Sequence, residues 1–165
     1  MPFQREVLGG VDDRGAAVLR LPPPICAMIY LALAAAGAWA LGWPLVPGLP
    51  QPLLGGAVFF LAWIAPVWAF RLFQREGTEV EPTSAANRRL VTRGPYRFSR
   101  NPMYLGLAVS TLGLALWIGA WPFFAVPLAV FATAAFVHIP FEEAKMRRQF
   151  GAAYDDYAGS VRRWI

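Results

Sequence analysis

The chain has 165 residues, enough for one domain, and 57% of them are hydrophobic while only 15% are charged. Soluble domains have about 45–50% apolar and about 25% charged residues, so this composition favours a membrane protein. The single cysteine, Cys26, excludes a disulfide bond within the chain and a cysteine-based zinc site. The net charge of +5 does not indicate a nucleic-acid-binding protein, because ten acidic residues are interleaved with the basic ones beside apolar segments.

Four apolar runs follow one another along the chain, each close to the roughly 20 residues that cross a hydrocarbon core of about 30 Å. They cover residues 25–43, 53–70, 103–121 and 123–141. Because unpaired backbone polar groups cannot face lipid, each run is predicted to form a helix. Pro66 and Pro127 fall inside the second and fourth runs, where proline can kink a helix. The predicted fold class is therefore all-α, a polytopic membrane protein of about four transmembrane helices in a single domain, residues 1–165.

The charged residues are confined to three stretches. All fifteen Lys and Arg residues and all ten Asp and Glu residues lie before the first run, within residues 71–100, or after the fourth run. With four spans these stretches share one side, which the positive-inside rule assigns to the cytoplasm. Residues 1–21 carry several charges and no long apolar region, so they are predicted to be an N-terminal cytoplasmic segment and not a signal peptide. We expect an integral protein of a bacterial inner membrane with both termini in the cytoplasm.

The stretch TRGPYRFSRNPMYLG, residues 92–106, places dense positive charge at the start of the third run. Asn101 followed by Pro102 is typical of a helix N-cap and first helical position. The free N–H groups of this helix start, flanked by Arg97 and Arg100, favour binding of an anionic group. The alternative interpretation is a capped helix with arginines that reach to the membrane interface.

An acidic pair, Glu142 and Glu143, follows the fourth run. Ionisable groups so close to a bilayer are costly unless they are paired or used. On a helix, His138 would neighbour Glu142 and Arg147 would neighbour Glu143. If the third and fourth helices are antiparallel neighbours, this acidic pair meets the basic start of the third helix. The alternative is an amphipathic tail helix with internal ion pairs, and no set of residues has the spacing of a metal site.

Together the two clusters resemble integral-membrane methyltransferases of the isoprenylcysteine carboxyl methyltransferase and phospholipid methyltransferase superfamily. The resemblance rests on LVTRGPYRFSRNPMYLG, then a hairpin, then EEAKMRRQFGAAYDDYAGSVRRWI. It implies S-adenosylmethionine as the cofactor, with the central loop and C-terminal helix, in residues 90–163, forming its site. The cofactor-binding residues implied are Leu90, Val91, Gly94, Tyr96, Asn101, Pro102, Tyr104, Gly106, Glu142 and Glu143.

The resemblance also implies a catalytic set. Arg100 corresponds to the arginine beside the acceptor, Glu143 holds the cofactor or an acceptor proton, and His138 completes the set. This sequence differs from the family in that Asn101 replaces the more usual His, Met146 replaces Leu, and His138 stands where prenylcysteine enzymes carry an arginine. The implied function is S-adenosylmethionine-dependent methyl transfer to a lipophilic, membrane-borne acceptor, a small molecule or a lipid, whose acceptor group is a carboxylate, an amine or a thiol. The expected partners are this substrate and the membrane lipids.

Three alternatives remain open at this point. The first is a phospholipid N-methyltransferase, and the second is an NADPH-dependent reductase of a sterol or isoprenoid. The third is a non-enzymatic membrane scaffold in which the charged clusters serve only topology and packing. Dinucleotide binding would need more phosphate contacts than the short charged face offers, and neither a P-loop nor a GxGxxG motif is present.

Overall fold

The computed structural model describes residues 21–77 and 89–165. These residues form helices and turns, with one isolated bridge between Leu45 and Ala120 and no β-strand among them, so the all-α prediction is confirmed for this part of the chain. The α-helices are α3 (Pro23–Ala40), α4 (Pro52–Ala62), α5 (Ile64–Glu76), α6 (Pro102–Ile118), α7 (Ala125–Thr133), α8 (Ile139–Phe150) and α9 (Ala152–Ser160). Two 3₁₀ turns, η1 (Gly94–Arg97) and η2 (Trp121–Phe124), and one π-helical turn, η3 (Ala134–His138), complete the order.

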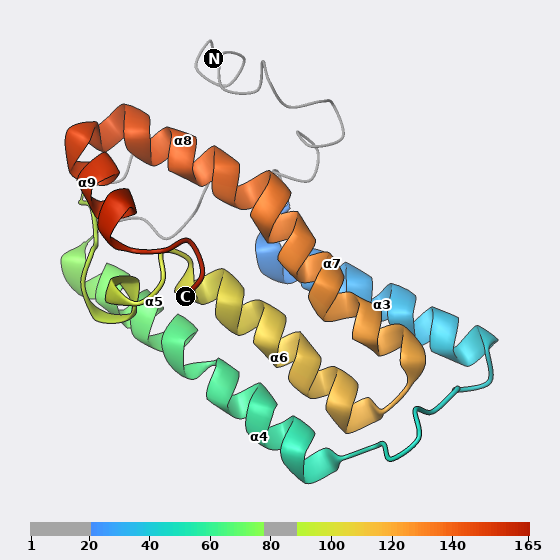
Figure 1. Ribbon diagram of the computed structural model, residues 1–165. Helices are drawn as coiled ribbons and strands as arrows, with labels where there is room; N and C mark the ends of the chain where they lie inside the picture. Colours follow the sequence, from blue (N-terminus) through green and yellow to red (C-terminus); the bar gives the residue numbers. More distant parts are fainter. Residues whose placement is uncertain (1–20, 78–88) are drawn as a thin grey trace.

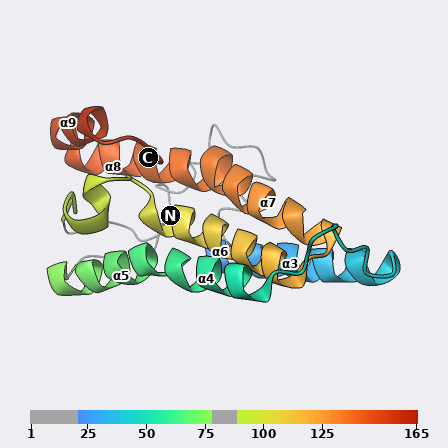
Figure 2. The same cartoon turned by 60° about the horizontal axis from the view of Figure 1, so that its bottom comes forward.

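All four apolar runs form helices that lie side by side (Figures 1 and 2). Among residues 21–77 and 89–165, three helical segments are long and apolar enough to cross a membrane: Pro23–Ala40, Pro52–Glu76 and Trp121–Phe150. The third run forms only the 17-residue helix α6, whose length at 1.5 Å per residue is about 25 Å. The protein is therefore a helical membrane protein, and a crossing by α6 remains a prediction.

Glycines allow α4 and α6 to pack backbone against backbone. A Cβ on Gly113 would lie 2.5 Å from the backbone nitrogen of Phe59, and one on Gly55 would lie 2.5 Å from that of Trp117. No side chain fits at these distances, so the two helices depend on glycine where they touch. Small residues at such contacts are typical of helix pairs in membranes, where close packing replaces the hydrophobic effect.

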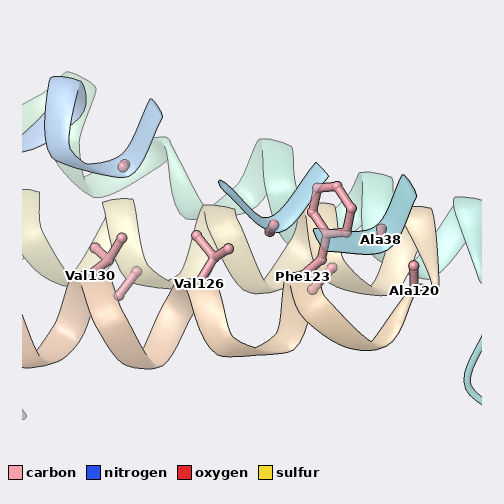
Figure 3. Packing of buried hydrophobic residues seen from close by; sticks show 9 residues of the cluster. Ala38, Ala120, Phe123, Val126 and Val130 are labelled. Carbon is pink, nitrogen blue, oxygen red and sulfur yellow. The ribbon is translucent and has the colours of Figure 1, made fainter. Parts of the chain in front are cut away.

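On the other side of α6, small residues of α3 receive larger side chains of η2 and α7. Ala38 is fully buried beside Phe123, and Val126 and Val130 continue the same buried row (Figure 3). This cluster fixes α3 against the α6–α7 hairpin, which in turn sets the position of the charged end of the hairpin.

The prolines change the helices at particular points. Pro66 has no N–H to donate to the carbonyl of Ala62, and the helix breaks nearby at Trp63, between α4 and α5. Pro127 falls in the first turn of α7, where a missing N–H is tolerated, so it does not divide the predicted fourth helix. The predicted fourth helix departs from α-helical geometry instead at η3, which ends two residues before Pro140.

The two ends of the helix bundle differ in chemistry. At one end, the uncharged loop after α3 is bonded to the turn between α6 and α7: Val46 N–H donates to the Gly119 carbonyl at 2.9 Å, and Trp121 N–H to that of Pro44 at 3.0 Å. The other end gathers the end of α5, η1, α8 and α9 (Figure 1), which carry the charged stretches. For the charged residues that the structure describes, this agrees with the predicted gathering of charge at one end. The predicted segment 1–21 lies outside the described residues except for Leu21.

Candidate active site

A pocket opens at the charged end of the bundle, between α5, η1, the start of α6, α8 and α9. Its empty volume, open mouth included, is about 800 Å³. Most of the residues that the resemblance implied meet here, although they come from separate parts of the chain. The predicted residues that line the pocket are Leu90, Val91, Tyr96, Arg100, Asn101, Pro102, Tyr104, Glu142 and Glu143.

Two predicted glycines lie outside the pocket lining and have packing roles. Gly94 has a φ of +63°, and a Cβ there would lie 3.1 Å from a methyl carbon of Leu72 on α5. Gly106 faces the break between α4 and α5, where a Cβ would lie 2.6 Å from both the carbonyl oxygen of Ala62 and a ring carbon of Pro66. Each glycine therefore permits a close approach that positions an element bearing pocket residues.

His138 also lies outside the lining. Its side chain is 2% exposed and stacks on the ring of Tyr104, with centroids 5.9 Å apart. Its Nε2 atom is buried and has no hydrogen-bond partner in the described part of the chain. The expected pairing with Glu142 is not found among the described residues, and the Glu142 carboxylate accepts a hydrogen bond from Tyr104. His138 therefore touches the pocket residue Tyr104 without lining the pocket itself.

The acidic and basic clusters meet as predicted for antiparallel neighbouring helices. The Tyr104 hydroxyl at the start of α6 donates a 2.5 Å hydrogen bond to Oε1 of Glu142 on α8. Glu143, on the same turn of α8, forms an ion pair with Arg100 at 3.3 Å. These two contacts join the start of α6 to α8 across the pocket.

Glu143 is the centre of a group of arginines. The residue as a whole is 5% exposed, and Arg163 binds both oxygens of its carboxylate, at 3.0 and 2.7 Å. Arg147, the predicted i,i+4 neighbour of Glu143, has its guanidinium 4.0 Å from the Glu143 carboxylate. Its shorter ion pair, at 3.1 Å, is with Asp155. A buried carboxylate needs such partners, since an unpaired charge in this position is costly.

Asn101 occupies the N-cap position of α6, but its side chain makes no capping hydrogen bond. Its Nδ2 group donates instead to the carbonyl of Arg163 at 2.9 Å, and its backbone N–H donates to Ser99 Oγ at 3.1 Å. The predicted N-cap position and the helix start at Pro102 are confirmed, while the Asn101 side chain bonds to the returning C-terminal residues, a partner that the local sequence does not reveal. Arg97 is exposed and lies outside the pocket lining.

An aromatic wall completes the pocket. The ring of Tyr96 packs edge-on against Phe73, with centroids 5.3 Å apart, and its carbonyl accepts a 2.9 Å hydrogen bond from the hydroxyl of Tyr157. Burial raises the pKa of both tyrosines, and of Tyr154 beside them, so all three remain neutral phenols at ordinary pH. Neutral aromatic faces of this kind suit a flat heterocycle or a cation.

Sequence reasoning missed part of this lining. Tyr154 and Tyr157 were visible as the spaced tyrosine pair in YDDY, but their contact with Tyr96 depends on how α9 folds back. The missed lining residues are Phe73, Arg89, Met103, Lys145, Met146, Tyr154 and Tyr157. Within the described ranges, no group of three potential ligands is arranged for a metal ion.

The part of the chain that carries most of the pocket is also the part that matches known proteins. Residues 50–153 match the phospholipid methyltransferase family. Over 73 residues, which are 44% of this chain, the sequence is 38% identical to Protein-S-isoprenylcysteine O-methyltransferase A of Arabidopsis thaliana. That match spans 36% of the length of the Arabidopsis protein, and no solved structure matches the chain. Because the family match covers more than half of the chain and contains the helices that carry most of the pocket, the chain belongs to the phospholipid methyltransferase family.

Proposed function

We propose that the protein transfers a methyl group from S-adenosylmethionine to a lipophilic, membrane-borne acceptor, with the pocket facing the cytoplasm. The observation that carries this proposal is the meeting of Tyr104 with Glu142 and of Arg100 with Glu143 in one aromatic-walled pocket. Membership of the phospholipid methyltransferase family supports the reaction class. The name of the Arabidopsis relative supports an isoprenylated acceptor.

The pocket residues fit the cofactor in their chemistry. The faces of Tyr96 and Phe73 offer a stacking surface for adenine. The Glu142 carboxylate retains acceptor capacity beyond its bond to Tyr104 and can receive hydrogen bonds from ribose hydroxyls or an ammonium group. When bound, S-adenosylmethionine supplies a methyl group activated by its positively charged sulfur.

The residues of this chain then have to orient the acceptor and exclude water. Effective transfer needs the reacting atoms roughly 3–3.5 Å apart and in line. Arg100 lines the pocket with a side chain 13% exposed, and its guanidinium is placed to hold an anionic acceptor group. Glu143 serves by holding Arg100 in place, which refines its expected role, because its own oxygens are already bound by arginines.

Titration calorimetry in detergent tests the cofactor site. The folded protein is expected to release or absorb heat on addition of S-adenosylmethionine or of its demethylated product S-adenosylhomocysteine, and not with NADPH. A folded sample that binds neither compound would contradict the proposal, and binding of NADPH alone would favour the reductase alternative.

The acceptor is identified by supplying a labelled methyl donor with extracted membrane lipids and determining the mass of the product. We expect a methyl ester of a lipophilic carboxylate, since an arginine faces the site. A methylated phospholipid amine would instead establish the second candidate, phospholipid N-methyltransferase, which the family description favours.

Arg100→Ala is expected to lower turnover at least about tenfold, on the scale of one lost charged hydrogen bond. Arg148→Ala, which removes an exposed arginine of α8, is the matched control.

A further inference from the structure

The last residues of the chain, 161–165, return across the start of α6, and we call them the C-terminal strap (Figure 1). Two backbone carbonyls of the strap are bound by the residues that precede α6. Arg100 N–H donates to the carbonyl of Arg162 at 3.0 Å, and Asn101 Nδ2 donates to that of Arg163 at 2.9 Å. The ring of Trp164 stacks on Phe131 of α7, with centroids 4.5 Å apart. These contacts fix the strap through its backbone and its aromatic end.

The side chain of Arg163 has a separate task. Its Nε and Nη2 atoms donate to the two oxygens of Glu143, at 3.0 and 2.7 Å, in the forked geometry that gives the strongest and most directional arginine–carboxylate contact. Arg163 does not line the pocket, whereas Glu143 and Arg100 do. The Glu143 carboxylate thus contacts Arg163, which lies outside the pocket lining, and Arg100, which belongs to it.

Arg100 is left only partly engaged by this arrangement. One of its terminal nitrogens lies 3.3 Å from Glu143 Oε1, while its buried Nε has no hydrogen-bond partner in the described ranges. Arg147 is bound by Asp155, so Arg100 and Arg163 share the single charge of Glu143. The one carboxylate charge of Glu143 therefore cannot balance both arginines, and of the two it is Arg100 that lines the pocket.

We propose that Arg163 is a positioning residue for an anionic acceptor: by occupying both oxygens of Glu143, it keeps the Arg100 guanidinium available to a carboxylate in the pocket. Without the Arg163 side chain, Glu143 draws Arg100 into a full two-bond pair, and the acceptor has to compete with that pair. This inference rests on the proposed function and deepens it by naming a lipophilic carboxylate as the acceptor class. The strap lies beyond residues 50–153, so the family match does not include it.

Binding measurements on the full chain test this role directly. The probe is S-farnesylcysteine with its free carboxylate, and the matched probe is its carboxamide, each titrated into detergent-solubilised protein saturated with S-adenosylhomocysteine. Wild-type protein is expected to prefer the carboxylate. Arg163→Gln keeps the bonded backbone carbonyl, and it is expected to weaken carboxylate binding about tenfold, the scale of one charge-assisted hydrogen bond. Carboxamide binding and S-adenosylhomocysteine affinity are expected to stay within about twofold.

Arg163→Lys keeps the charge but cannot form two parallel hydrogen bonds, so an intermediate loss is expected. This variant also keeps the test decisive if Arg163→Gln does not fold. Arg148→Gln, which removes an exposed charge from α8, is expected to bind both probes like wild type. An unchanged carboxylate preference in the Arg163 variants, or a wild type without that preference, overturns the inference. Failure of wild type to bind S-adenosylhomocysteine contradicts the proposed function instead.

Discussion

Tyr104 and Glu142, 38 positions apart in the sequence, share a 2.5 Å hydrogen bond that ties the first turn of α6 to α8. The ring of Tyr104 is held from behind by His138, so the hydroxyl has little freedom to turn elsewhere. Because both partners line the pocket, this bond and the Arg100–Glu143 ion pair together join the α6 and α8 walls of the pocket. Its removal should therefore affect ligand binding as well as stability.

Tyr104→Phe is expected to weaken binding of S-adenosylhomocysteine and to lower stability by about 1–3 kcal/mol, since it leaves the Glu142 carboxylate without its donor. Calorimetric titration and thermal unfolding in detergent measure the two effects. Tyr30→Phe is the matched control, because it removes a 2.7 Å hydrogen bond to Thr133 between α3 and α7, away from the pocket. Equal loss of ligand affinity in both variants would contradict a local role for Tyr104.

Gly113→Ala is expected to destabilise the protein by about 1–3 kcal/mol, as overpacking does, because its Cβ would lie 2.5 Å from the backbone nitrogen of Phe59. Gly159→Ala on exposed α9 is the control: a Cβ there meets nothing within 4 Å. That substitution should stabilise α9 by about 0.5–1 kcal/mol through helix propensity. The melting temperatures are thus expected to rank Gly159→Ala above wild type above Gly113→Ala, and a reversed order would refute the packing described for α4 and α6.

The buried tyrosines predict a loss of stability at high pH. Burial raises the pKa of Tyr157 in the folded state above its ordinary value of 10.0, so the unfolded chain loses this proton first as pH rises. The contribution of the neutral phenol is complete below pH 10 and is lost progressively above it. Unfolding measured between about pH 8 and pH 11 should show this decline. Tyr157→Phe should show a shallower one, together with a loss of about 1 kcal/mol at neutral pH from the missing bond to the Tyr96 carbonyl. Parallel pH curves for the two proteins would contradict the assignment.

The four-span topology predicts opposite accessibility for the two ends of the bundle. Cys26→Ala gives a background without thiols, since the chain has a single cysteine. In that background, Pro47→Cys lies in the uncharged loop and Asp156→Cys on exposed α9. A membrane-impermeant maleimide should label the first protein in intact cells and the second only in inverted vesicles. Labelling of both from the same side would mean that α6 and its neighbours do not cross as predicted.

The helices of the fold could be predicted from the sequence because backbone polar groups cannot remain unpaired in a bilayer. A run of about 20 apolar residues has to become a helix, and all four runs do so. The helix break at Trp63 and the π-helical turn before Pro140 were less predictable. A proline in the sequence indicates that one backbone hydrogen bond of the helix is missing. The packing of neighbouring helices determines at which residue the helix departs from α-helical geometry.

The candidate site divides in the same way. The resemblance predicted Tyr96, Tyr104 and Glu142 as site residues because they lie in short sequence patterns with fixed spacing, and all three line the pocket. It did not reveal the C-terminal strap, whose contacts with Asn101 and Glu143 join residues far apart in the chain. Nor did it show that the Glu143 carboxylate is bound by Arg100 and Arg163, the contacts on which the proposed positioning of Arg100 rests.

The sequence by itself determined the helical membrane character and the separation of charged from uncharged ends, because composition and local patterning decide both. It also placed the residues of α6 and α8 that meet in the pocket. Only the tertiary structure decided which carboxylate pairs with which partner: Glu142 takes Tyr104, and Glu143 takes Arg100 and Arg163. Adjacent glutamates look equivalent along the chain, but successive residues of a helix point about 100° apart and so face different neighbours.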